Sequence, residues 1–174
     1  MTNITVKVTR LHMDAVLPKK AHADDAGFDL AAVEDVLINP GETVLVKTGL
    51  AFELPPGYEM QIRPRSGVTL KTKLRVHLGT VDANYRGEVG VIVDNTSDRD
   101  ATYSPCDITG ETVLISGGQS IYGTYTIRKG DRIAQAVIQR LPSVEMFEVD
   151  ELGDSGRGTA GFGSTGVREA DKND

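Results

Sequence analysis

LRVHLGTVDANYRGEVGVIV (residues 74–93) places a turn-rich stretch between two stretches with the character of β-strands. Leu74 to Leu78 and Glu88 to Val93 are apolar or alternate in polarity over the length of a strand, which is typical of β-structure. The segment between them, residues 79–87, is rich in Gly, Asp and Asn and predicts a hairpin connection. The stretch therefore favours a fold built from antiparallel strands.

Similar stretches recur along the chain, separated by Pro-Gly, Pro-Pro-Gly, Gly-Gly and Lys-Gly turns. The further predicted strands are Ile4–Val8, Thr43–Leu54, Tyr58–Arg63, Thr112–Ile115, Ile121–Ile127 and Arg132–Leu141. One short helix is favoured at Ser66–Thr72, with Ser66 as its N-cap. The 19 glycines and a hydrophobic content of 39% suit short strands and turns, so the chain is predicted to be all-β.

A length of 174 residues fits one domain with a tail. Residues 1–150 carry the strand-like stretches. Residues 151–174 are rich in Gly and charged residues, so they predict a flexible C-terminal arm.

Composition and charge exclude several classes of protein. A net charge of −6 and a pI near 5.1 argue against a partner that is a nucleic-acid polymer, because such binding needs a basic face. The chain has no apolar run of about 18 residues, so no membrane contact is predicted. Its single cysteine, Cys106, predicts no internal disulfide. We therefore expect a cytoplasmic protein.

Several polar residues stand where a binding or catalytic group would be expected. Asp82 lies in the loop of residues 79–87, although an isolated turn aspartate often binds only its own backbone. Arg65, Ser66 and Gly67 offer a guanidinium, a hydroxyl and N–H groups at a helix start, which suits an anion. Asp29 and Gln135 are polar residues in apolar strands, where each side chain needs a partner.

The arm contains G-x-G-x-x-G twice, at residues 156–161 and 161–166. Neither copy follows a strand and opens a βαβ unit, so neither predicts a dinucleotide site. The segment carries Arg157 and Phe162 on a flexible strip rich in N–H donors, which could fold over a phosphate-bearing ligand. A disordered linker is the alternative.

Five segments, in order, resemble the five motifs of the trimeric dUTPase family. They are Asp24–Ala32, Arg63–Lys73, Gly79–Asp94, Gly130–Gln139 and Gly156–Gly166. The stretch between the third and fourth motifs, residues 96–126, is similar to an insertion of some bacteriophage members. The resemblance implies a jelly-roll fold of the dUTPase-like β-clip type, assembled as a homotrimer whose flexible C-terminal arms close over shared active sites. It also implies a bacterial or phage-infected host cell as the setting.

The resemblance further implies hydrolysis of dUTP to dUMP and pyrophosphate by Mg²⁺-dependent attack of water on the α-phosphate. This reaction would lower dUTP and supply dUMP for thymidylate synthesis. Asp82 would be the general base and Asp29 would hold the metal through water. Substrate contacts are implied for Arg65, Ser66, Gly67, Val76, Gly79, Thr80, Val81, Tyr85, Gln135, Arg157, Phe162, Gly163 and Ser164.

One position departs from the family pattern. Many members carry an Asn where this chain has Val76, so uracil recognition would rest on backbone groups of residues 76–82. Two alternatives stay open at this point. One is the activity of the related dCTP deaminases, and the other is a regulatory role in which residues 96–126 bind a protein partner.

Overall fold

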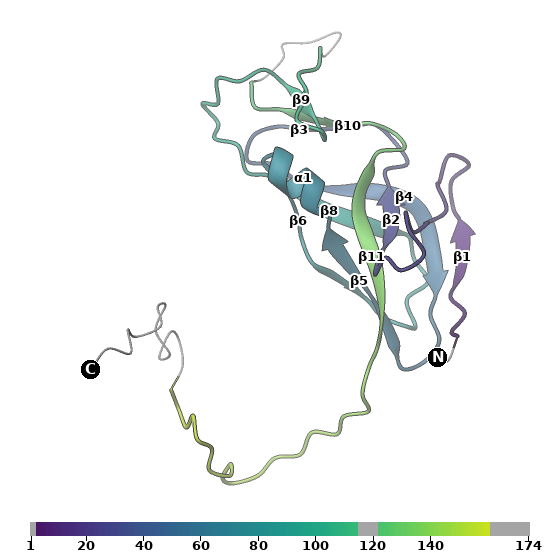
Figure 1. The fold of residues 1–174 in the computed structure, drawn as a ribbon, viewed down its shortest axis with the longest axis vertical. Coiled ribbons are helices and arrows are strands. Elements are labelled where there is room, and N and C mark those ends of the chain that lie inside the picture. The colour runs from purple at the N-terminus through teal and green to yellow at the C-terminus, as the bar shows by residue number, and fades with distance from the viewer. Residues whose placement is uncertain (1–2, 115–121, 161–174) are drawn as a thin grey trace. The chain divides into compact units, whose positions relative to one another are not determined.

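The computed structural model describes residues 3–114 and 122–160 and divides the chain into two units between Ser143 and Val144. All the strands of the described residues belong to the first unit, which we call the β-body (Figure 1). No helix among the described residues is long and apolar enough to cross a membrane.

The β-body contains two four-stranded sheets and one three-stranded sheet. The first sheet has the order β1 (Lys7–Arg10), β4 (Thr43–Glu53), β8 (Val89–Asn95) and β6 (Leu74–Val76). The second has the order β2 (Phe28–Ala31), β11 (Arg132–Arg140), β5 (Tyr58–Pro64) and β7 (Gly79–Val81). The third has the order β3 (Val36–Ile38), β10 (Tyr125–Ile127) and β9 (Cys106–Asp107). Every strand pair is antiparallel except β9 with β10, and the prediction of an all-β fold is confirmed.

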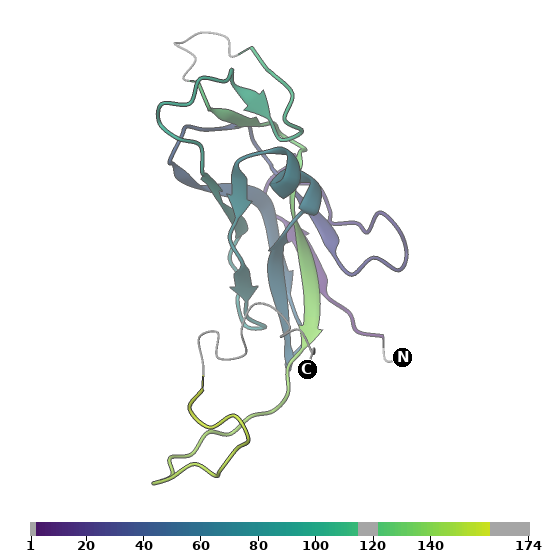
Figure 2. The same ribbon diagram turned by 60° about the vertical axis from the view of Figure 1, so that its left-hand side comes forward.

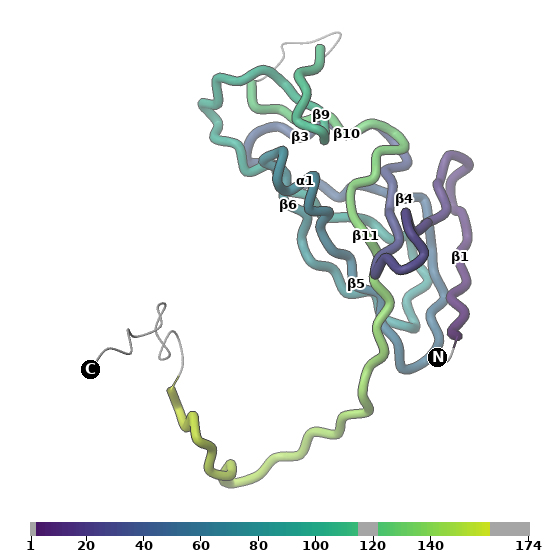
Figure 3. Tube along the Cα trace, in the orientation of Figure 1, coloured from purple at the N-terminus to yellow at the C-terminus, as the bar shows by residue number. Residues whose placement is uncertain are grey.

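One apolar core joins the two large sheets. In β8 the side chains of Val89, Val91 and Val93 are buried whereas Ile92 between them is exposed, as expected for a strand with one face in the core. Other large side chains with almost no exposure come from both sheets and from the third one, namely Leu30, Ile38, Leu50, Met60, Leu74, Ile127 and Ile133. Figure 3 traces the path of the chain around this core.

The connection between β6 and β8 is more than a turn. The two strands pair as predicted, with Val76 opposite Val93. The segment between them, however, contains the short strand β7, which pairs with β5 in the second sheet. The prediction of a simple hairpin loop over Gly79–Val81 is therefore wrong. The backbone groups of these residues form hydrogen bonds with β5 of the second sheet. The local sequence does not reveal this pairing, because β5 lies elsewhere in the chain.

Three other local predictions need correction. In the predicted strand Thr112–Ile115, the described residues 112–114 form no strand, and Thr112 makes only an isolated bridge with Cys106. Helix α1 spans Ser66–Lys71, but its N-cap is the extended residue Arg65 and no side chain caps the helix. Ser66 therefore lies inside the first turn. The first strand begins at Lys7 rather than at Ile4, because its bounds follow the residues of β4 that it pairs with.

A buried amide fixes the start of the predicted insertion, residues 96–126. Asn95 is 1% exposed, and its Nδ2 donates to the carbonyl oxygens of Ile38 at 2.9 Å and Gly123 at 2.8 Å. Its Oδ1 accepts the backbone N–H of Ser97 at 3.0 Å. Figures 1 and 2 show the sheet of β3, β9 and β10 at one end of the β-body, beyond α1. Asn95 thus ties both ends of the segment of residues 96–126 to each other and to β3.

Replacing this amide should destabilise the β-body. Asn95→Leu keeps a similar volume but removes the amide donor from two buried carbonyls, so the free energy of unfolding in urea should fall by about 1–3 kcal/mol. Thr96→Val, which removes only an exposed hydroxyl bonded to the Lys73 carbonyl, is the control and should change it by less than about 0.5 kcal/mol. Equal stabilities for the two variants would contradict this account of Asn95.

Candidate active site

The register of three strands builds one row of motif residues. In the second sheet, Gln135 of β11 lies directly opposite Asp29 of β2 on one side and Arg63 of β5 on the other. Residues directly opposite one another in an antiparallel pair project from the same face of the sheet. Segments that are far apart in the sequence therefore meet at one place.

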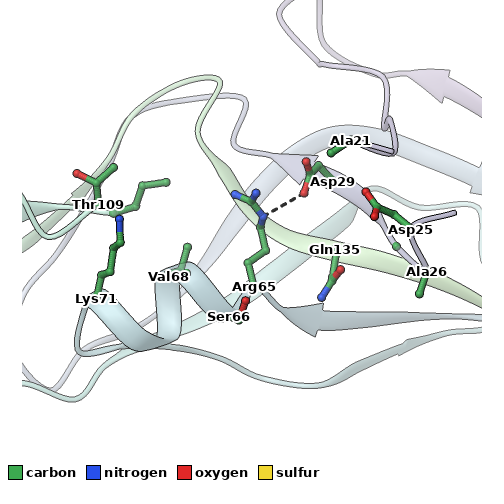
Figure 4. Close-up of a pocket in the computed structure, with 13 residues that line it drawn as sticks. Ala21, Asp25, Ala26, Asp29, Arg65, Ser66, Val68, Lys71, Thr109 and Gln135 are labelled. Carbon is green, nitrogen blue, oxygen red and sulfur yellow. Dashed lines mark ion pairs between the residues drawn. The ribbon is translucent and has the colours of Figure 1, made fainter. Parts of the chain in front are cut away.

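A cleft of about 430 Å³ opens beside this row (Figure 4). Its walls come from the loop before β2, from α1, from β11 and from the predicted insertion. The lining residues are Ala21, Asp25, Ala26, Gly27, Asp29, Arg65, Ser66, Gly67, Val68, Lys71, Ile108, Thr109 and Gln135.

Asp29 is held by two arginines. Its Oδ1 lies 3.0 Å from Nε of Arg65 and its Oδ2 lies 2.9 Å from Nη1 of Arg132. Arg65 also donates from Nη1 to the Arg132 carbonyl at 2.9 Å. The Asp29 and Arg65 side chains are mostly buried, so their positions are fixed before any ligand arrives. These three side chains, one carboxylate and two guanidinium groups, together carry one net positive charge.

Gln135 is fixed in the same way. Its Nε2 donates to the Pro64 carbonyl at 3.0 Å, which gives the amide the partner expected of a polar group in an apolar strand. Across from it, a Cβ atom at Gly27 would lie 2.6 Å from Oε1 of Gln135. Glycine at that position is therefore what lets the loop before β2 approach the amide.

The carboxylates of the cleft do not form a cage for a metal. Within residues 3–114 and 122–160, no group of three His, Cys, Asp or Glu residues is placed to hold an ion. Both oxygens of Asp29 are engaged by arginines, and Oδ2 of Asp25 accepts the His22 N–H at 2.8 Å. A cation here would be held mainly by a ligand and by water.

Asp82 and Tyr85 lie in the turn after β7. The Tyr85 N–H donates to the Asp82 carbonyl at 3.1 Å, and the Tyr85 hydroxyl donates to the Glu88 carbonyl at 3.0 Å. The Tyr85 ring remains half-exposed, and neither residue belongs to the lining of the cleft.

The register of β5 with β7 explains this separation. Val81 lies opposite Met60, and Arg65 comes five residues after Met60, just beyond the end of β5. At about 3.3 Å per residue, those five residues span roughly 17 Å. Because the strands are antiparallel, Asp82 continues in the direction away from Arg65. Within one chain, the two candidate groups are therefore at opposite ends of β5.

The other predicted substrate residues fall into three groups. Val76 ends β6, and Gly79, Thr80 and Val81 form β7, the last strand of its sheet. Arg157 belongs to the second unit, where its Nε donates to the Ala160 carbonyl at 2.8 Å. Phe162, Gly163 and Ser164 lie outside the described residues.

The structure adds residues that the sequence did not single out. Arg132 binds Asp29, and Lys71 and Thr109 line the cleft. Arg132 has a sequence signal, since it stands three residues before Gln135 in the fourth motif-like segment. Lys71 resembles an ordinary surface charge, and Thr109 carries no local signal of a site.

Comparison with known proteins identifies the family. The family model for dUTPase matches residues 13–108 and 106–166. A deoxyuridine 5'-triphosphate nucleotidohydrolase of Gloeothece citriformis is 46% identical over 164 residues, which cover 93% of this chain and 97% of that protein. A protein of the same name from Solibacter usitatus is 44% identical over 170 residues, covering 95% and 99%.

Solved structures of dUTPases are also similar to this chain. The dUTPase of Staphylococcus bacteriophage 80alpha with dUpNHpp has a TM-score of 0.88 and 36% identity, covering 94% of this chain and 99% of that one. The dUTPase of phage phi11 of S. aureus, solved to show its species-specific insert, has a TM-score of 0.80 and 36% identity, covering 85% and 97%. The family match, the relatives and the fold of this chain together show that it belongs to the dUTPase family.

Proposed function

We propose which residues of this chain carry out the hydrolysis of dUTP to dUMP and pyrophosphate. This is the activity that the names of the curated relatives describe. The observation that carries the proposal is the cleft in which Asp29 fixes Arg65 beside Gln135. The reaction lowers dUTP and supplies dUMP for thymidylate synthesis.

The cleft binds the triphosphate. Arg65 keeps N–H groups beyond those paired with Asp29, and Ser66, Gly67 and Gln135 add a hydroxyl, a backbone N–H and an amide. Charge-assisted hydrogen bonds from such groups are stronger than neutral ones. Because Arg65 and Gln135 are already fixed, they stabilise charge on the phosphate oxygens with little reorganisation.

Asp82 is the general base for the water that attacks the α-phosphorus, a role that contributes roughly 10²- to 10⁴-fold in rate. Tyr85 lies against the deoxyribose. The hydrogen bond from its hydroxyl to the Glu88 carbonyl orients the ring, which remains half-exposed and open to a ligand. The uracil is bound by backbone groups of Val76 and β7. Since β7 ends its sheet, one side of its backbone has no strand partner among the described residues and can pair with an imide edge.

The active site is shared between chains of a homotrimer. Asp82 and Arg65 stand at opposite ends of β5, so Asp82 acts on a triphosphate held in the cleft of a neighbouring chain. The second unit supports assembly as well, because Val144, Met146 and Phe147 are 64%, 95% and 82% exposed and need a surface to cover them. A third chain contributes the arm, with Arg157 on the phosphates and Phe162, Gly163 and Ser164 around the base.

Mg²⁺ fits this cleft as an ion held by phosphates and water. A structure of a variant dUTPase from phage phi11 concerns the coordination of a structural Mg(II) ion in that protein. Here Asp29, with both oxygens paired to arginines, still has lone pairs that accept hydrogen bonds from metal-bound water. When bound, the ion would neutralise charge on the phosphate oxygens.

Removing the base tests the assignment directly. Asp82→Asn keeps the shape of the side chain but is a far poorer base, so kcat for dUTP should fall at least ~10²-fold while dUTP still binds. Asn84→Ala, in the same exposed turn, is the control and should stay within about threefold. The measurement is pyrophosphate release from dUTP, the other dNTPs and UTP. Near-normal turnover by Asp82→Asn would remove Asp82 from this role, and ammonia release from dCTP would favour a deaminase.

Removing the carboxylate that pairs with Arg65 and Arg132 tests whether Asp29 organises the cleft. Asp29→Asn removes the charge that holds Arg65 and Arg132, and hydrogen bonds to charged groups contribute about 1.5–3 kcal/mol, so kcat/KM for dUTP should fall by about tenfold or more. Asp14→Asn breaks only a surface pair with Lys129 at 3.3 Å and should leave kcat/KM nearly unchanged. If Asp29→Asn folds normally and stays within about twofold of the wild type, then Asp29 does not organise the cleft.

A further inference from the structure

One end of the cleft combines a lysine of α1 with a turn of the predicted insertion. Lys71 is the last residue of α1, and Ile108 and Thr109 belong to the segment of residues 107–111, which we call the 107–111 turn. Figure 4 shows the Lys71 side chain pointing toward Thr109, at the end of the cleft away from Asp25. The 107–111 turn therefore forms part of the wall of the cleft.

The 107–111 turn is held rigidly. Oδ1 of Asp107 accepts the Thr109 N–H at 2.8 Å, the Thr109 hydroxyl at 2.6 Å and the Glu111 N–H at 3.2 Å. Burial would raise the pKa of Asp107, but the hydrogen bonds from Thr109 and Glu111 and the charge of Arg128 together lower it. Asp107 is thus the ionised acceptor around which the turn is built.

Gly110 fits the turn against α1. It has φ +85°, and a Cβ atom there would lie 2.8 Å from the Lys71 carbonyl oxygen. The backbone of the turn therefore lies directly on the end of the helix that carries Lys71. The Thr109 hydroxyl donates its hydrogen bond to Asp107, so its oxygen can still accept one, and Figure 4 shows the Lys71 side chain pointing toward Thr109.

The charges in the cleft distinguish Lys71 from Arg65. Arg65 is paired with Asp29, whereas no carboxylate of the described residues lies within 4.0 Å of the Lys71 ammonium. An ammonium group at an anion-binding cleft without its own counterion is suited to bind a charged oxygen of the ligand.

We propose that Lys71 binds the terminal phosphates of the substrate, the part that leaves as pyrophosphate, and that Thr109 is a positioning residue for the Lys71 ammonium. This inference rests on the proposed function. Ile108 and Thr109 of the same chain close the end of the cleft at Lys71. The uracil, in contrast, is bound by the β7 region of a neighbouring chain. The terminal phosphates therefore occupy the walled end.

The test compares the two products as inhibitors of dUTP hydrolysis in the presence of Mg²⁺. Lys71→Met should raise the inhibition constant of inorganic pyrophosphate roughly tenfold or more, because a charge-assisted hydrogen bond is lost. The inhibition constant of dUMP, which lacks the terminal phosphates, should change by less than about twofold. Lys71→Arg keeps the charge and should restore most of the pyrophosphate affinity. Lys73→Met, an exposed lysine of the same segment, is the control of equal charge and should leave both constants unchanged.

Thr109 is tested with its own pair of variants. Thr109→Val removes the hydroxyl and should raise the pyrophosphate constant about threefold, whereas Thr109→Ser should restore it. Gly110→Ala should push the turn away from α1 and act like Thr109→Val. Gly57→Ala is its matched control, since Gly57 has φ +79° and no atom within 4 Å of its Cβ position.

The outcomes separate the two proposals. A wild-type protein that does not hydrolyse dUTP would refute the proposed function itself. A wild-type protein that does hydrolyse it, with a pyrophosphate constant unchanged in Lys71→Met, would refute only the role of Lys71. Equal increases for pyrophosphate and dUMP would also overturn that role, because they indicate general damage to the cleft. If Lys71→Met fails to fold, the Thr109 pair decides the question in the same way.

Discussion

The register of β11 between β2 and β5 is the constraint on which the cleft depends. It places Gln135 opposite Asp29 and Arg63, so three strands bring their motif residues into one row. Asp29 then lies where Arg65 and Arg132 both reach it. A slip of one residue would turn every side chain of β11 to the other face of the sheet, and the buried Ile133 and Val137 oppose such a slip.

The pairing of β5 with its neighbours also separates the two groups of candidate site residues within one chain. β5 carries Arg65 just beyond one end, and its partner β7 leads to Asp82 beyond the other. A single chain therefore holds a cation-lined cleft and a separate carboxylate turn, and the proposed trimer is the arrangement that brings the two together. In this view the fold fixes each half of the site rigidly, and assembly sets the distance between the halves. The predicted insertion, residues 96–126, extends the half that bears the cleft, since its 107–111 turn lies against α1.

The sequence predicted those parts of the fold whose signal is local. Long strands with one buried face, such as β4, β8 and β11, are visible as alternating or apolar runs. The very short β3 and β9 are not, because they form only by pairing with β10 far along the chain. The sequence predicts a turn at β7 for the same reason, because β7 forms only by pairing with β5.

The residues of the candidate site could likewise be predicted only where the signal is local. Asp29 and Gln135 were visible as polar residues in apolar strands, because burial demands a partner for each. The sequence does not single out Arg132 and Thr109, since their places at the cleft arise from contacts made after folding. The proposed role of Asp82 rests on the family resemblance, because no local sequence pattern distinguishes a general base from a turn aspartate.

Subunit complementation tests the shared site most directly. Asp82→Asn and Arg65→Met chains, each inactive alone, are co-refolded in equal amounts, and subunit exchange is verified by native mass spectrometry. With sites shared between chains, random mixing leaves about a quarter of the sites with an intact Arg65 from one chain and an intact Asp82 from its neighbour, so about a quarter of wild-type activity should return. A double variant mixed with wild-type chains serves as the reference for mixing. Mixed assemblies as inactive as either parent would contradict the account.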